Sequence, residues 1–289
     1  MAWGEERWRK MSEQNLGAPV HQHTNTPVLG GLVTALRTLT VLRVPGRDAA
    51  TLASALPWFP LVGLLVGGGV GLVLAGVAHG LHWPAGAAVL GVVLSAALTG
   101  GLHYDGLADT VDGWRGGRTL ARRLEIMKDS RIGAMGALAL VLVLLLQVVA
   151  LTRLAELGGG ALRLVPLAFI LSRLAMTLHA VSLPYARAEG GTAGLFVKGA
   201  RGWHFITALL SAAILCGALA GAGGLLAVVS AALLAVALRG WMRANFGGIT
   251  GDLLGCGCVM VETVLLLALA AAAPLLPPAV FTFSCFPCR

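Results

Sequence analysis

Long stretches without charged side chains alternate along this chain with short segments that carry most of the charge. An apolar α-helix needs about 20 residues to cross roughly 30 Å of hydrocarbon, and six uncharged stretches approach or exceed that length. They are residues 59–79, 85–102, 136–152, 164–183 (interrupted only by Arg173), 205–238 and 263–280. Residues 205–238 suffice for two crossings hinged at Gly221-Ala-Gly-Gly224. The pattern predicts an all-α, polytopic integral membrane bundle of about seven transmembrane helices.

Composition excludes a soluble helical protein. Apolar residues make up 57% of the chain, charged residues only 12%, and the mean hydropathy is +0.84. Too few polar residues remain to cover a water-exposed surface. Residues 28–44 carry Arg37 and Arg43 and are predicted to form an interfacial or partly inserted helix. We expect a single membrane-embedded domain at 28–280, between a polar, disordered tail (1–27) and a short C-terminal tail (281–289).

The cations are unevenly divided between the two sides of this bundle. If seven spans run from a cytoplasmic N-terminus, seventeen of the 21 Lys and Arg residues fall on one side. The positive-inside rule assigns that side to the cytoplasm. Such a face suits anionic lipids and phosphate-bearing ligands. No basic run is interleaved with aromatic residues, so a nucleic-acid partner is excluded, whereas a homo-oligomer stays open.

Three aspartates directly follow the second predicted span. Asp105, Asp109 and Asp112 have the spacing i, i+4, i+7, which places them on one helical face. The nearest cation, Arg115, comes only after the cluster. Oxygen ligands favour hard divalent cations, and Mg²⁺ is commonly held by a few carboxylates together with water and substrate phosphates. We therefore expect the three aspartates to bind Mg²⁺ or Mn²⁺, with a solvated helix start as the alternative.

A second polar motif, Met127-Lys-Asp-Ser-Arg-Ile-Gly-Ala-Met-Gly136, precedes the third span. Lys128 offers a point charge to a phosphate, Arg131 a bidentate fork and Ser130 a hydrogen-bonding group. The glycines loosen a helix start whose free N–H groups favour anions. A positive-inside anchor is the alternative, but beside three carboxylates we favour phosphate binding.

Further polar residues occur within or next to the apolar stretches. Arg173 is costly inside a membrane unless it is paired, so it either pairs with Glu262 or reaches a substrate phosphate, and we favour the phosphate. Thr250 and Asp252, in a glycine-rich segment, and Glu262 in the last span are expected to line the same site. His103 and His179 are interpreted as ordinary polar residues rather than ligands.

Three runs closely resemble the cobalamin synthase family. They are Gly100-Gly-Leu-His-Tyr-Asp-Gly-Leu-Ala-Asp-Thr-Val-Asp-Gly113, Leu124-Glu-Ile-Met-Lys-Asp-Ser-Arg-Ile-Gly133 and Gly248-Ile-Thr-Gly-Asp252. Weaker similarities lie at 42–45, 59–67 and 184–187. Tyr104 stands where many members of the family carry Glu.

This resemblance implies an adenosylcobinamide-GDP ribazoletransferase, the enzyme of the last assembly step of cobalamin. A ribose hydroxyl of α-ribazole, or of α-ribazole phosphate, displaces GMP from adenosylcobinamide-GDP in the presence of Mg²⁺. The resemblance also implies a bacterial or archaeal cytoplasmic membrane, with the active site facing the cytoplasm. We assign Asp105 and Asp109 to the metal, and Asp112 or Asp129 as a further ligand or as the base.

Two other classes fit less well. A CDP-alcohol phosphatidyltransferase also sets aspartates on membrane helices, but its motif requires Ala-Arg where this chain has Asp109-Thr110. Its later Gly-x-x-x-Asp-x-x-x-Asp run is absent. A transporter would place its polar site at the bilayer midplane between inverted repeats, whereas these acids lie at the edge of a span and no internal repeat is visible.

Overall fold

The computed structural model describes residues 27–275, which are almost entirely helical. The α-helices are α2 (Pro27–Leu39), α3 (Phe59–Gly80), α4 (Pro84–Thr99), α5 (Leu102–Gly116), α6 (Leu120–Ile126), α7 (Ala134–Leu157), α8 (Val165–Ser182), α9 (Thr192–Gly199), α10 (Gly202–Phe246) and α11 (Gly251–Ala272). Short 3₁₀ segments are η1 (Leu52–Trp58), η2 (Gly159–Leu164) and η3 (Ala273–Leu275). The expected N-terminal tail, apart from Pro27, and the ending 281–289 lie outside the described residues.

Five helical stretches in this part of the chain are long and apolar enough to cross a membrane: Leu52–Gly80, Ala134–Leu157, Gly159–Ser182, Gly202–Phe246 and Gly251–Leu275. Helices α4 and α5, which meet at a bend of 89°, make a sixth if the bent pair is counted as one span. Gly100 and Gly101 lie at this bend with φ of 62° and 71°, a region that favours glycine. Helix α2 has only 13 residues and is too short to span. The predicted all-α polytopic membrane bundle is confirmed.

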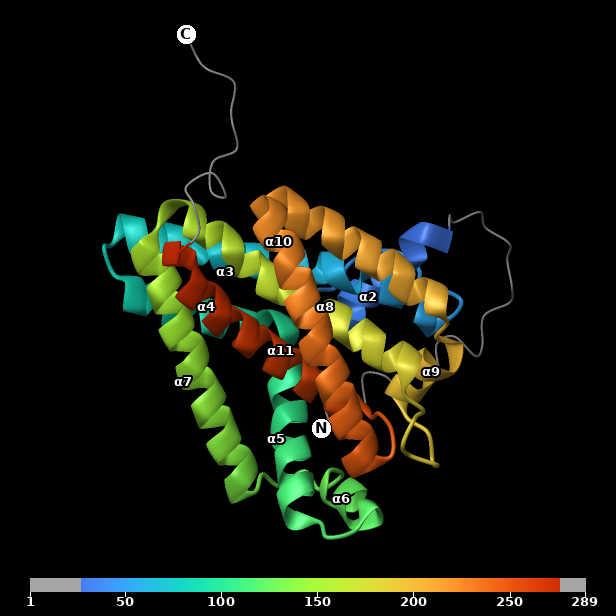
Figure 1. Ribbon diagram of the computed structural model, residues 1–289. Helices are drawn as coiled ribbons and strands as arrows, with labels where there is room; N and C mark the ends of the chain where they lie inside the picture. Colours follow the sequence, from blue (N-terminus) through green and yellow to red (C-terminus); the bar gives the residue numbers. More distant parts are fainter. Residues whose placement is uncertain (1–26, 276–289) are drawn as a thin grey trace.

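The longest helix, α10, consists of two arms. Its backbone leaves the helical conformation at Ala220 and at Gly221, where φ is 54°. The arms diverge from this hinge, one towards α9 and the other towards α6 (Figure 1). A Cβ on Gly224 would lie 1.9 Å from the carbonyl oxygen of Cys216, so the turn requires glycine there. The hinge falls where the sequence predicted it, and counting each arm as a crossing brings the spans to about seven.

Helix α8 lies at the centre of the bundle and packs against α3, α10 and α11 (Figure 1). Two glycines allow α3 to approach it closely. A Cβ on Gly63 would lie 2.3 Å from the carbonyl oxygen of Phe169, and one on Gly67 would lie 2.8 Å from the Cα of Pro166. This small-x-x-x-small spacing is typical of membrane helix pairs. It gives the glycines of the 59–67 run a packing role.

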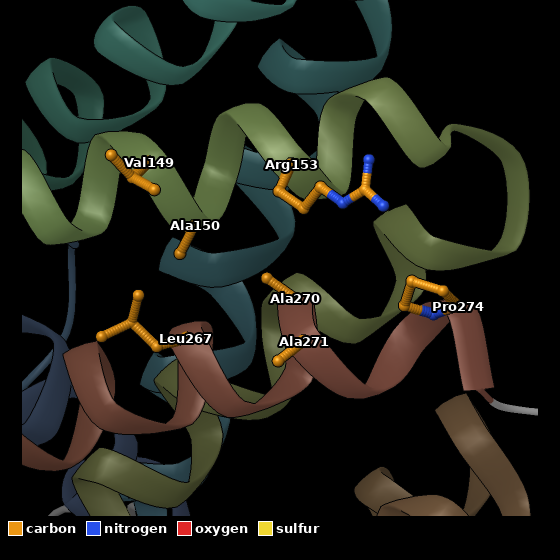
Figure 2. Close-up of a pocket in the computed structure, with 7 residues that line it drawn as sticks. All are labelled: Val149, Ala150, Arg153, Leu267, Ala270, Ala271 and Pro274. Carbon is orange, nitrogen blue, oxygen red and sulfur yellow. The ribbon is translucent and has the colours of Figure 1, made fainter.

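Apolar side chains face outward on the peripheral helices. On α7, Leu142, Leu145 and Val149 are each more than half exposed, as expected for a surface that faces lipid. Towards the C-terminal ends of α7 and α11, a cavity of about 350 Å³ is apolar except for one cation (Figure 2). It is lined by Val149, Ala150, Arg153, Leu267, Ala270, Ala271 and Pro274. None of the predicted site residues lines this cavity: Asp252 lies in the first turn of α11, Glu262 lies at its middle, and the predicted loop residues precede α7.

Candidate active site at the starts of α5, α7 and α11

Helix α5 carries the three predicted metal ligands and packs against α11 and α7. Its contact with α11 is close. A Cβ on Gly106 would lie 2.6 Å from the carbonyl oxygen of Asp252, and one on Gly255 would lie 3.2 Å from the Cα of His103. These glycines therefore bring the aspartates of α5 next to the first turn of α11, about 150 residues later in the chain.

Asp112 binds the start of α7. Its two carboxylate oxygens accept hydrogen bonds of 2.8 Å from the backbone N–H groups of Gly133 and Gly136. A Cβ on either glycine would lie within about 2.5 Å of an Asp112 oxygen, so a side chain at either position would displace this carboxylate. The helix start does bind an anion, as its glycines suggested, but the anion present is Asp112 of the same chain.

Asp105 and Asp109 are placed differently. Asp105 is exposed, whereas Asp109 is partly buried. The oxygen Oδ2 of Asp109 is buried and accepts no hydrogen bond from any residue in 27–275. The carboxylates of Asp105 and Asp252 lie close enough to repel the charge on Asp109. A buried, unpartnered carboxylate oxygen among like charges is unfavourable unless a cation is supplied.

The surroundings of the three aspartates of α5 decide which of them can bind Mg²⁺. Within residues 27–275, no three His, Cys, Asp or Glu side chains are grouped closely enough to hold a metal by themselves. Mg²⁺, however, is usually bound through one or two carboxylates together with water and substrate phosphates. Asp105 and Asp109 meet that requirement. Asp112 is less suited, because both of its oxygens already accept backbone hydrogen bonds.

The glycine-rich segment before α11 positions Asp252. Gly247, with φ of 70°, ends α10, and Thr250 caps α11 by accepting a hydrogen bond of 3.2 Å from the backbone N–H of Leu253. A Cβ on Gly248 would lie 2.2 Å from the carbonyl oxygen of Pro184. Thr250 is fully buried, so its observed role is to form the helix start that carries Asp252.

The loop between α8 and α9 pairs with this segment. Ala186 N–H donates to the carbonyl oxygen of Ile249 at 2.9 Å, and Ile249 N–H donates to that of Pro184 at 2.8 Å. The loop thereby places Arg187 against α11, where its Nη2 donates to Oδ2 of Asp252 at 2.7 Å. Our site prediction omitted Arg187. The similarity at 184–187 was the available signal, but the pairing itself is a long-range contact that no local pattern predicts.

The loop before α7 carries its charges in two ion pairs. Lys128 donates to Glu189, which lies two residues after Arg187 on the α8–α9 loop. Nη2 of Arg131 donates to Asp129 at 2.6 Å, and the backbone N–H of Arg131 donates to the same carboxylate at 3.1 Å. These bonds lower the pKa of Asp129 to about 2, which makes it a weak base. Ser130 is exposed.

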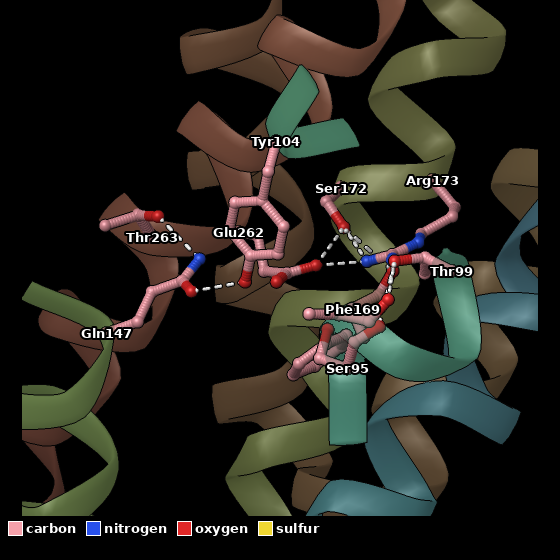
Figure 3. Close-up of polar contacts among 10 residues, drawn as sticks. Ser95, Thr99, Tyr104, Gln147, Phe169, Ser172, Arg173, Glu262 and Thr263 are labelled. Atoms are coloured by element: carbon pink, nitrogen blue, oxygen red, sulfur yellow. Dashed lines mark hydrogen bonds and ion pairs between the residues drawn. The ribbon is translucent and has the colours of Figure 1, made fainter. Parts of the chain in front are cut away.

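Arg173 and Glu262 form an ion pair inside the bundle, between α8 and α11 (Figure 3). Their side chains are 2% and 5% exposed. Nη1 of Arg173 also donates to Oγ of Ser172 at 2.9 Å, and the guanidinium lies 5.2 Å from the centroid of the Phe169 ring. Of the two alternatives left open by the sequence, the structure contains the pairing with Glu262; a contact of Arg173 with substrate stays a prediction.

A chain of hydrogen bonds lies beside this ion pair (Figure 3). The hydroxyl of Tyr104 donates to Oε1 of Gln147 at 2.7 Å, and Nε2 of Gln147 donates to Oγ1 of Thr263 at 2.9 Å. It links α5, α7 and α11 within the bundle. Gln147 was not predicted as functional, although a lone amide in an uncharged span was a usable signal. Tyr104 therefore has a structural partner rather than a place among the carboxylates.

Comparison with known proteins finds relatives over most of the chain. Residues 31–270 match the family model described as "Cobalamin-5-phosphate synthase". A protein of Chlorobaculum tepidum, named adenosylcobinamide-GDP ribazoletransferase, is 44% identical over 247 residues, which cover 84% of this chain and 96% of that protein. One of Chlorobaculum parvum with the same name is 46% identical, covering 81% of this chain and 92% of its own length.

A relative from another genus has the same name. The protein of Syntrophobacter fumaroxidans, also named adenosylcobinamide-GDP ribazoletransferase, is 44% identical over 82% of this chain and 96% of its own length. No solved structure matches the chain. The family model spans the aspartates of α5, the loop before α7 and the Gly248–Asp252 segment. The chain belongs to the cobalamin-5-phosphate synthase family.

Proposed function

We propose that this protein is an adenosylcobinamide-GDP ribazoletransferase. It transfers the cobinamide phosphate of adenosylcobinamide-GDP to α-ribazole or α-ribazole phosphate, releases GMP and forms adenosylcobalamin or its phosphate. Family membership and the names of its relatives support this assignment. The observation that carries it is the meeting of Asp105 and Asp109 with Asp252, from motifs far apart in the sequence, at the start of α11.

The chemistry defines what the site must supply. A ribose hydroxyl oxygen bonds to the phosphorus that carries cobinamide, and the bond from that phosphorus to the bridging oxygen breaks. The bridging oxygen leaves with GMP, and the hydroxyl proton passes to a base. Negative charge is spread over the phosphate oxygens in the transition state, so positioning and charge neutralisation dominate catalysis.

Asp105 and Asp109 would hold Mg²⁺ or Mn²⁺, which when bound neutralises phosphate oxygens and the leaving GMP. We exclude Asp112 from the metal ligands because it caps α7. Neither predicted base is free in this structure, because Asp112 accepts hydrogen bonds from backbone N–H groups and Asp129 is bound by Arg131.

The remaining predicted residues divide into two groups. Lys128, Ser130 and Arg131 lie on the exposed loop before α7 and are proposed to bind the outer part of the nucleotide. The Arg173–Glu262 pair is proposed to hold α8 against α11, and a contact of Arg173 with a substrate phosphate stays a prediction. The distribution of cations supports a location in the cytoplasmic membrane, with the aspartates open to the cytoplasm.

Release of GMP by the purified protein tests this function. We expect GMP from adenosylcobinamide-GDP only when α-ribazole or its phosphate is also present, measured by chromatography together with the cobalamin product. A CDP-alcohol and inositol serve as the matched substrates of the rival phosphotransferase class. Release of CMP from that pair with no GMP from adenosylcobinamide-GDP would contradict the proposal, as would release of neither nucleotide.

A further inference from the structure

Arg187 pairs with Asp252 next to the aspartates Asp105 and Asp109 of α5. The pairing of its loop with the segment before α11 determines its place through backbone hydrogen bonds. Its side chain is 15% exposed, as is that of Asp252. The favourable charge of Arg187 offsets part of the repulsion that Asp105 and Asp252 exert on Asp109. Arg187 therefore belongs electrostatically to the aspartate site.

The ion pair with Asp252 does not use all the hydrogen-bonding capacity of Arg187. A guanidinium has five N–H donors, and the hydrogen bond to Asp252 uses one on Nη2. The Nε–H group is buried and has no acceptor within residues 27–275. A buried donor without an acceptor is unfavourable. Arg187 thus has an unused donor, and its charge acts on Asp109, whose buried oxygen also lacks a partner among the described residues.

Two other arginines considered as phosphate ligands are less well placed. Arg173 is buried with Glu262 between α8 and α11. Arg131 is 87% exposed and its fork binds Asp129. Arg187 is partly buried, lies among the carboxylates and has an Nε–H donor without an acceptor among the described residues. Partial burial strengthens its interaction with an anion, because water screens the charges less.

We propose that Arg187 binds a phosphate oxygen of the diphosphate linkage in the nucleotide substrate, while Asp252 orients its guanidinium. The inference rests on the proposed function, and it names a substrate-binding residue of that same site. A diphosphate placed beside Asp105 and Asp109 needs cations on the protein side as well as a metal, and the arginine fork matches two phosphate oxygens in a way that lysine cannot.

Binding measured without turnover tests this inference. Purified wild-type protein and the Arg187→Lys variant, in lipid nanodiscs with Mg²⁺, are each dialysed against adenosylcobinamide-GDP, and separately against α-ribazole. The lysine keeps the charge but loses the fork, so we expect its Kd for adenosylcobinamide-GDP to rise about tenfold or more. The Kd for α-ribazole should not change. Arg122→Lys, in the exposed pair with Glu125, is the matched control and should bind both compounds like wild type.

Two results would overturn the inference. One is a wild-type Kd for adenosylcobinamide-GDP in Arg187→Lys. The other is an equal loss of affinity for both compounds, which would indicate that Arg187 only maintains the structure. Addition of α-ribazole to the wild-type sample then tests the function separately. A protein that binds the nucleotide and releases no GMP contradicts the proposed function, while the Kd comparison still decides the role of Arg187.

Discussion

Asp109 and Asp112 lie within one turn of the same helix and yet have different surroundings. Asp112 accepts two backbone hydrogen bonds at the start of α7, whereas Asp109 keeps a buried oxygen without a partner among the described residues. Helical spacing shows that they share a face, but it does not show what lies opposite each of them. Opposite Asp112 lie Gly133 and Gly136, whose lack of a Cβ lets its carboxylate approach the helix start.

Asp112 should therefore matter for stability. In Asp112→Ala, two charge-assisted hydrogen bonds at a helix start are lost, and we expect the protein to lose about 2 kcal/mol of stability. Asp105→Ala, on an exposed position of the same helix, should leave stability nearly unchanged. Thermal unfolding of the purified variants in detergent compares the two. Equal midpoints for Asp112→Ala and wild type would refute the capping role.

Substitution of Arg131 tests whether this residue binds substrate or only anchors the loop before α7. Arg131→Lys keeps the positive charge but loses the fork, so GMP release should fall sharply if the loop binds a phosphate. Arg47→Gln removes a cation outside the predicted motifs and serves as the control. An unchanged rate in Arg131→Lys would favour the anchor, because orientation depends on charge and many cations share that task.

At the scale of elements, the glycines of the family motifs act mainly as contact points between helices and loops. Gly63 and Gly67 join α3 to α8, and Gly106 joins α5 to α11. Gly248 lies against Pro184 and so joins the α8–α9 loop to the segment before α11. These contacts bring Asp105, Asp109, Arg187 and Asp252 together.

Gly248 offers a direct test of this packing. A Cβ there would lie 2.2 Å from a backbone oxygen, so Gly248→Ala should displace the α8–α9 loop and reduce GMP release at least tenfold. Gly68→Ala is the matched control, since a Cβ on Gly68 meets nothing within 4 Å. The two variants are compared by activity at equal amounts of folded protein. Similar rates for both would show that the contact is dispensable.

Several elements could be predicted from sequence because they depend on local pattern. Uncharged stretches predicted the spans, and the glycines at 221–224 predicted the hinge, because lipid requires continuous helices and only glycine turns so tightly. Partners across the fold could not be predicted in this way. Asp112 meets residues 21 and 24 positions later, and Arg187 meets Asp252 65 positions later, through side-chain contacts that leave no periodic signal in the sequence.

For the molecule as a whole, a shared active site requires the starts of α7 and α11 to face the same side of the membrane. Single cysteines placed at Arg118, on the α5–α6 connection, and at Arg163 should react with membrane-impermeant reagents from opposite sides. In oriented vesicles we expect position 118 to be labelled only from the cytoplasmic side, because most cations lie there. Labelling of position 118 only from the outside would invalidate the orientation.

The central claim is that the aspartates of α5 hold a divalent cation on which transfer of the cobinamide phosphate depends. The most direct measurement is the rate of GMP release as Mg²⁺ is titrated into metal-free wild type and Asp109→Asn. We predict no release without metal, restoration by Mg²⁺ in wild type, and a rate at least a hundredfold lower in Asp109→Asn at saturating metal, with its thermal midpoint unchanged. Equal rates in the two proteins, or full activity of wild type after chelation, would contradict the account.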